Sequence, residues 1–120
     1  MYKPAIEGFP EANKELFDVG ELITQKTHEL NDAREKYLYA KALWENNYAR
    51  YLLETKVKNL EMTQEEIKAS ATNLAYEDKL TAIKAESSYK KLVNEIKALR
   101  DKISVLQEIS WNLRKERIQG

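Results

Sequence analysis

The side chains that could carry chemistry are few in this sequence, and their spacing does not bring them together. His28 is the single histidine and cysteine is absent, and a lone imidazole makes neither a catalytic triad nor a closed metal site. Acidic residues adjoin each other at Glu65 and Glu66 and again at Glu77 and Asp78, but neighbours on a helix point about 100° apart. Such pairs do not converge on one point, as a glycosidase or a two-metal site requires. We therefore expect a protein that is not an enzyme and that uses no cofactor and no metal.

The composition favours an all-α protein. The chain has 120 residues, room for one domain, and is 33% charged with only three glycines and two prolines. This mixture is typical of long helices and lacks the glycine-rich loops that bind phosphate. Twenty basic residues balance twenty acidic ones, so no global field attracts nucleic acid or an anionic membrane. Because no apolar run approaches the ~20 residues of a membrane span and the N-terminus lacks a signal-peptide core, we expect a cytoplasmic protein without a membrane partner.

Local signals divide the chain into four segments. Residues 1–10 contain both prolines and should form an extended N-terminal arm. Residues 11–58 follow as helix one, in which Gly20 is a weak spot that could mark a kink. Residues 59–62 form a turn, and residues 63–117 form helix two. Thr63 and Glu66 have the spacing of a capping box, in which Thr63 accepts from the Glu66 amide and Glu66 reaches back to the Thr63 amide.

Both helices carry a seven-residue apolar repeat, which persists only where a helix keeps facing another helix. In helix one the repeat includes Tyr37, Trp44 and Tyr51. In helix two a leucine ladder with isoleucines between its steps continues the pattern. Its large members are Leu92, Ile96, Leu99, Ile103, Leu106 and Leu113. We predict that these residues form the packing and oligomer seam of a long antiparallel, coiled-coil-like helical hairpin.

The apolar arc is wider than a two-stranded seam requires, so we expect two hairpins to dimerise into a four-helix bundle. Polar residues within the seam more often set register than carry out catalysis. With the turn near Leu60, Asn47 and Asn73 should lie opposite each other and could pair through their amides. If they pair, replacing Asn47 with leucine should raise thermal stability and loosen the oligomeric state.

A cluster of cations in helix two supports an alternative function. Basic residues suit a helix C-terminus, but in a dimer they could also form a local phosphate-binding patch despite the neutral total. The candidate residues are Lys90, Lys91, Lys97, Arg114, Lys115 and Arg117. Tyrosines and a tryptophan between the lysines of helix one could stack on unpaired bases, but Tyr37, Trp44 and Tyr51 are better explained as core.

Several stretches resemble a known group of proteins. They are residues 62–67 (MTQEEI) after the turn, Tyr89, the leucine ladder, and residues 106–114 (LQEISWNLR). These segments resemble small helical proteins encoded in bacteriophages and prophages, often near recombination or replication genes. The resemblance covers about half of the chain and implies a phage accessory factor in the host cytoplasm, without implying an activity for any residue.

The favoured interpretation is therefore a non-enzymatic helical structural or protein-interaction protein that self-associates and offers its outer faces to another protein. The alternative is a nucleic-acid-binding accessory protein of phage recombination or replication that uses the basic C-terminal patch.

Overall fold

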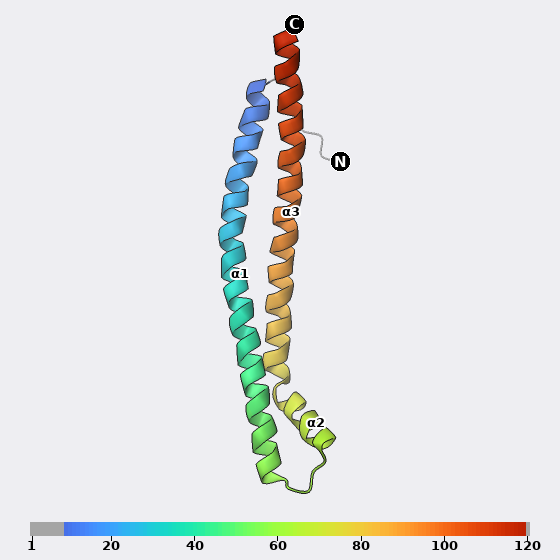
Figure 1. Ribbon diagram of the computed structural model, residues 1–120. Coiled ribbons are helices and arrows are strands. Elements are labelled where there is room, and N and C mark those ends of the chain that lie inside the picture. The colour runs from blue at the N-terminus through green and yellow to red at the C-terminus, as the bar shows by residue number, and fades with distance from the viewer. Residues whose placement is uncertain (1–8, 120) are drawn as a thin grey trace. The chain divides into compact units, whose positions relative to one another are not determined.

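The computed structural model describes residues 9–119, with side chains for residues 10–116. Three helices account for these residues: α1 (Phe9–Lys58), α2 (Gln64–Leu74) and α3 (Tyr76–Gln119). The described residues contain no strand. The chain divides into two compact units: unit 1 comprises Met1–Leu30 and Lys91–Gly120, and unit 2 comprises Asn31–Lys90. In each unit α1 runs antiparallel to α3 (Figure 1), which confirms the predicted all-α class and helical hairpin.

Helix α1 begins and ends with local signals. It starts at Phe9, with Pro10 in the first turn, where the missing amide of proline costs no intrahelical hydrogen bond. Helix one therefore starts earlier than the predicted Glu11, and the rest of the predicted arm, residues 1–8, lies outside the described residues. The helix runs unbroken through Gly20 to Lys58. A turn follows, in which the Met62 amide donates to the Asn59 carbonyl at 3.1 Å.

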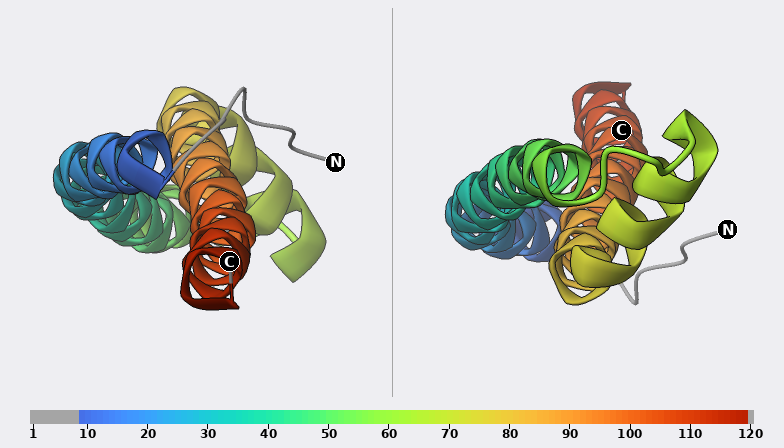
Figure 2. Two further views of the ribbon diagram at one scale, coloured as in Figure 1. Left: turned by 90° about the horizontal axis from the view of Figure 1, so that it is seen from above. Right: turned by 90° about the horizontal axis from the view of Figure 1, so that it is seen from below.

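The predicted second helix, residues 63–117, is wrong in one respect, because it is two helices separated at Ala75. Ala75 has ψ of 7°, far from the helical value of about −42°. The bend keeps its hydrogen bonds, since the Ala75 amide donates to Ala71 at 2.9 Å and the Lys79 amide donates to Ala75 at 3.0 Å. Figure 2 shows α2 set at an angle to the first turns of α3.

Residue spacing explains the bend. The buried residues Ile67, Ala71 and Ala75 are each four apart, whereas farther along α3 the buried and half-buried positions Leu92, Ile96, Leu99, Ile103 and Leu106 alternate steps of four and three. A straight helix returns to one side every 3.6 residues, so repeated steps of four rotate the buried face around the axis. The bend at Ala75 lets both segments keep their apolar side inside unit 2.

Thr63 caps α2 as the sequence indicates, with one difference. Its hydroxyl oxygen accepts from the Glu66 amide at 3.2 Å. The same hydroxyl donates to the Glu66 carboxylate at 3.0 Å, so Glu66 binds the Thr63 side chain rather than the predicted backbone amide. The cap satisfies one of the amide groups that the start of a helix leaves without a partner.

Each unit has a narrow core. In unit 1, Ala12 and Val19 of α1 and Ile96 and Leu106 of α3 are buried, and Leu106 is the largest fully buried side chain among the described residues. In unit 2 the buried positions hold small or medium side chains. These are Ala40, Thr55, Ile67, Ala71 and Ala75. Two-helix packing therefore covers one stripe of each helix and leaves the remaining apolar side chains accessible.

Candidate interaction surfaces

The residues predicted as a packing and oligomer seam lie on the inner sides of the helices. Ile96 and Leu106 are buried. The other members are half-buried: Tyr37, Trp44, Tyr51, Leu92, Leu99, Ile103 and Leu113. In unit 2, the Tyr37 ring stacks on Tyr89 of α3 with centroids 5.9 Å apart. Tyr37 therefore packs α1 against α3 in unit 2.

Trp44 anchors an aromatic cluster in unit 2. Its ring is nearly parallel to that of Tyr48, with centroids 5.5 Å apart and planes 3° apart. The Lys79 ammonium lies 5.8 Å from the Trp44 ring centroid, within the range of a cation–π contact. A shallow groove of about 150 Å³ adjoins the cluster and is also lined by Lys41 and Glu86. The indole Nε1 is buried without a hydrogen-bond partner among the described residues.

Asn47 pairs with a different residue from the predicted one. Its side-chain amide donates to the Asp78 carboxylate at 2.8 Å in a partly buried position of unit 2. Asn73 is exposed and lies on α2, so the predicted Asn47–Asn73 pair is wrong. The bend at Ala75 turns α2 away from the line of α3 and changes which residues lie opposite α1. The polar group inside the seam is therefore an amide–carboxylate pair.

A second polar contact lies in unit 1, where the Lys26 ammonium is 3.2 Å from Glu95 and 3.4 Å from Glu29. The hydrogen bond to Glu95, followed by that to Glu29, raises the pKa of Lys26 above its ordinary value of 10.5. A raised pKa in the folded state means that the contact stabilises the fold at neutral pH. That stabilisation is lost as the pH rises through the pKa of Lys26.

The structure does not gather the predicted nucleic-acid patch into one cluster. Lys90 belongs to unit 2 and lies 2.6 Å from Glu86, a hydrogen bond that raises the pKa of Lys90 and offsets its charge. Lys91, Lys97, Arg114 and Lys115 are exposed in unit 1. Of these four, Lys97 and Lys115 share one side of α3, since eighteen residues make five helical turns, whereas Arg114 lies about 100° from Lys97 around the helix. The side chain of the sixth candidate, Arg117, lies outside the described residues.

His28 is exposed, and no group of three or more metal-binding side chains occurs in the described part of the chain. Within residues 9–119, no helix combines the length and apolar character needed to cross a bilayer.

Large apolar side chains are exposed in unit 2 over the last turns of α1, in the turn that follows it and at Leu74, the last residue of α2. They are Leu53 (66% exposed), Val57 (73%), Leu60 (88%) and Leu74 (55%), and we call this set the apolar end. A groove of about 210 Å³ adjoins it, between the last turns of α1 and the first turns of α2. Leu52 and Leu53 line the α1 side of this groove, and Ile67 lines the α2 side.

Sequence reasoning included Leu53 and Leu74 in a wide apolar arc but did not locate a surface. Leu53 lies on α1 and Leu74 directly precedes the bend at Ala75, and only the folded chain shows that both remain uncovered. Comparison with family models, curated proteins and solved structures finds no match to this chain.

Proposed function

We propose that this chain is a non-enzymatic helical protein that self-associates through the apolar end of unit 2. The observation that supports the proposal is the exposure of Leu53, Val57 and Leu60 at the end of α1 and in the turn after it, with Leu74 at the end of α2 also exposed. Burying a side chain of this size is worth about 1.5–3 kcal/mol. Large exposed apolar patches on soluble proteins commonly mark interaction sites.

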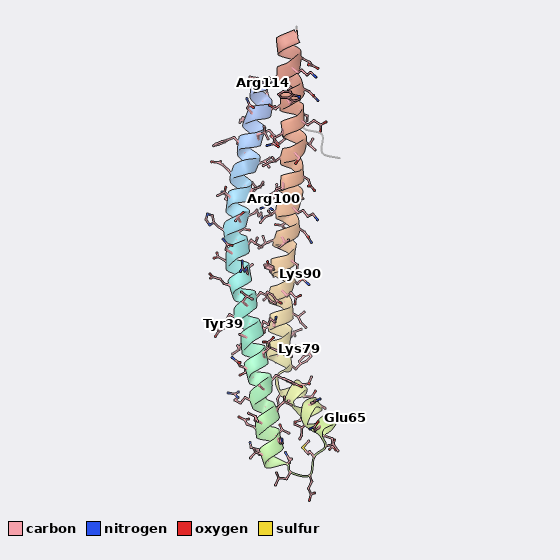
Figure 3. The ribbon with its side chains drawn as sticks, in the orientation of Figure 1. Tyr39, Glu65, Lys79, Lys90, Arg100 and Arg114 are labelled. Atoms are coloured by element: carbon pink, nitrogen blue, oxygen red, sulfur yellow. The ribbon has the colours of Figure 1, made fainter. Side chains whose placement is uncertain are left out.

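The charges around the apolar end favour a second copy of the same chain as its partner. The last turn of α1 carries Lys56 and Lys58, and the first turn of α2 carries Glu65 and Glu66. Figure 3 shows Glu65 on α2. A two-fold symmetric interface joins the same patch on both copies, so residue i of one copy meets residue j of the other, and the reverse. A patch with a basic half and an acidic half is therefore complementary to itself.

In this arrangement the end of α1 from one copy lies against the start of α2 from the other. Four helix segments then enclose the leucines, as in a short four-helix bundle. Stable interfaces bury about 1,200–2,000 Å² in total, so contacts beyond the four exposed side chains must contribute. The faces that remain outside the interface are available to another protein.

The first experiment measures mass in solution. At tens of micromolar, light scattering should give twice the chain mass of 14.0 kDa. Replacing Leu53 and Val57 together with glutamine should give a monomer with unchanged helical circular dichroism. The matched control replaces Leu22 and Val93, exposed apolar residues of unit 1, and should remain a dimer. A monomeric wild-type chain would contradict the proposal.

A charge exchange tests the symmetry of the interface. Lys56→Glu alone and Glu65→Lys alone should each weaken the dimer, because each places like charges opposite each other. The two changes combined in one chain should restore it, since opposite charges face each other again. If the combined variant is weaker than either single variant, the two-fold arrangement is wrong.

A further inference from the structure

The groove of unit 2 between the end of α1 and the start of α2 combines apolar and basic side chains. Its volume is about 210 Å³. Residues three and four apart share one helix face, and each helix contributes residues at these spacings. The lining residues are Leu52, Leu53 and Lys56 of α1 and Gln64, Ile67 and Lys68 of α2. Each helix thus places one lysine beside the apolar side chains, and none of the lining residues is acidic.

The two lysines of the groove, Lys56 and Lys68, are exposed. No ion pair joins either of them to a carboxylate among the described residues. The positions three and four residues from Lys56 are uncharged, and those around Lys68 include one acidic residue, Glu65. The next carboxylate, that of Glu66, accepts from the Thr63 hydroxyl. Both ammonium groups are therefore open to an anion from outside the chain.

The apolar side chains of the groove are unequally covered. Ile67 of α2 is buried, whereas Leu53 on the α1 side is 66% exposed. An alkyl chain laid against Leu53 removes apolar surface of both molecules from water, and this favours binding in proportion to the area covered. Ligand sites commonly combine an apolar lining with a few placed polar groups. This groove has both components.

We propose that the groove binds an alkyl carboxylate, namely a medium-chain fatty acid. The carboxylate lies between the ammonium groups of Lys56 and Lys68, and the Gln64 amide is a further donor. The alkyl chain lies along Leu53 and Ile67. A bare anion leaves the apolar part of the groove uncovered, and a neutral alkyl chain leaves the two lysines without a counter-charge. At ~30 Å³ for a water-sized group, the groove holds about seven such groups, which suits a chain of about six to eight carbons.

Bound fatty acid acts on the self-association proposed above, because both use Leu53 and Lys56. Covering Leu53 removes an apolar contact from the dimer interface. Pairing Lys56 with a carboxylate removes its attraction to the acidic start of α2 in the second copy. A ligand that binds only the free surface favours the monomer by mass action. This regulation rests on the proposed dimer, whereas binding in the groove does not.

Isothermal titration calorimetry with sodium octanoate, below its micelle concentration and at low salt, tests the binding. We expect a dissociation constant of about 0.1–1 mM for a ligand of this size. In a series from hexanoate to dodecanoate, each added methylene should tighten binding by up to about fourfold until the groove is full. An equal gain at every step to dodecanoate would show uptake by an unbounded surface and would overturn the proposal.

Paired variants test the contribution of the lysines. Lys56→Gln combined with Lys68→Gln should weaken octanoate binding by about tenfold or more, because the carboxylate loses both charged donors. The matched control, Lys36→Gln combined with Lys84→Gln, makes the same charge change at exposed lysines of unit 2 outside the groove and should bind octanoate as the wild type does. Equal weakening in both pairs would assign the effect to net charge and overturn the site.

Two further measurements separate the groove from general apolar binding. Octylamine, which has the same chain length and the opposite charge, should not bind, and binding equal to that of octanoate would overturn the carboxylate assignment. Octanoate should shift amide NMR signals mainly within residues 52–56 and 64–68. Shifts of similar size along the whole of α1 and α3 would show that no single site exists.

Light scattering tests the regulation. In saturating octanoate, the mass should fall from twice the chain mass to the chain mass. A dimer that persists while calorimetry shows binding would overturn the competition but not the site. A chain that is monomeric without octanoate would overturn the proposed dimer, and the titration would still decide whether the groove binds the ligand.

Discussion

The hydrogen bond between Asn47 and Asp78 gives the sharpest test of the packing in unit 2. The 2.8 Å contact joins an amide to a carboxylate in a partly buried position. Hydrogen bonds to charged groups contribute about 1.5–3 kcal/mol, and partial exposure places this one near the lower limit. Asn47→Ala should therefore reduce the free energy of unfolding by about 1.5 kcal/mol, and the melting temperature by roughly 4–8 °C.

Whether Asn47→Leu raises or lowers the free energy of unfolding distinguishes the two possible partners of Asn47. If Asn47 faced another amide, an apolar replacement would raise stability. Because it faces Asp78, Asn47→Leu leaves a carboxylate without its donor and should lower stability. Replacing Asn47 and Asp78 together with leucine removes both polar groups and should be nearly neutral or stabilising.

Thermal and urea unfolding followed by circular dichroism, at one protein concentration, measure these effects. The matched control is Asn46→Ala at the adjacent exposed position, which should change stability by less than ~0.5 kcal/mol. An Asn47→Leu protein as stable as the wild type, or more stable, would refute the reasoning.

Three further variants test other parts of the fold by thermal unfolding. Leu106→Ala empties a fully buried position and should cost about 2–5 kcal/mol, whereas Leu38→Ala at a 50% exposed position should cost less; equal losses would contradict the core assignment. Gly20→Ala should stabilise the chain by about 0.5–1 kcal/mol, because a Cβ at Gly20 meets nothing within 4 Å. A loss of stability in this variant would contradict the open space around Gly20. Thr63→Ala removes the α2 cap and should cost about 1 kcal/mol, more than Thr72→Ala within the same helix, and hydrogen exchange should increase first in α2.

Features that depend on neighbours along the chain were predictable from the sequence. The poverty in glycine and proline predicted helices, and the spacing of Thr63 and Glu66 predicted the start of α2. The alternation of three and four residues predicted which residues of α3 turn inward. These features follow from the geometry of a single helix, in which sequence spacing sets angular position.

Features that depend on residues across the fold were not predictable in the same way. Periodicity states which side of a helix a residue occupies, but not which residue of the other helix it meets. The pairing of Asn47 with Asp78 rather than Asn73 required the bend at Ala75, where steps of four end and the alternating steps begin.

The sequence by itself determined the helices, their apolar sides and the place where the chain turns, because local hydrogen bonding and side-chain periodicity decide these. Only the tertiary structure decided which apolar side chains stay uncovered near Leu60 and that Asn47 pairs with Asp78. Both depend on how neighbouring helices divide their surfaces between each other and solvent, which no single stretch of sequence contains.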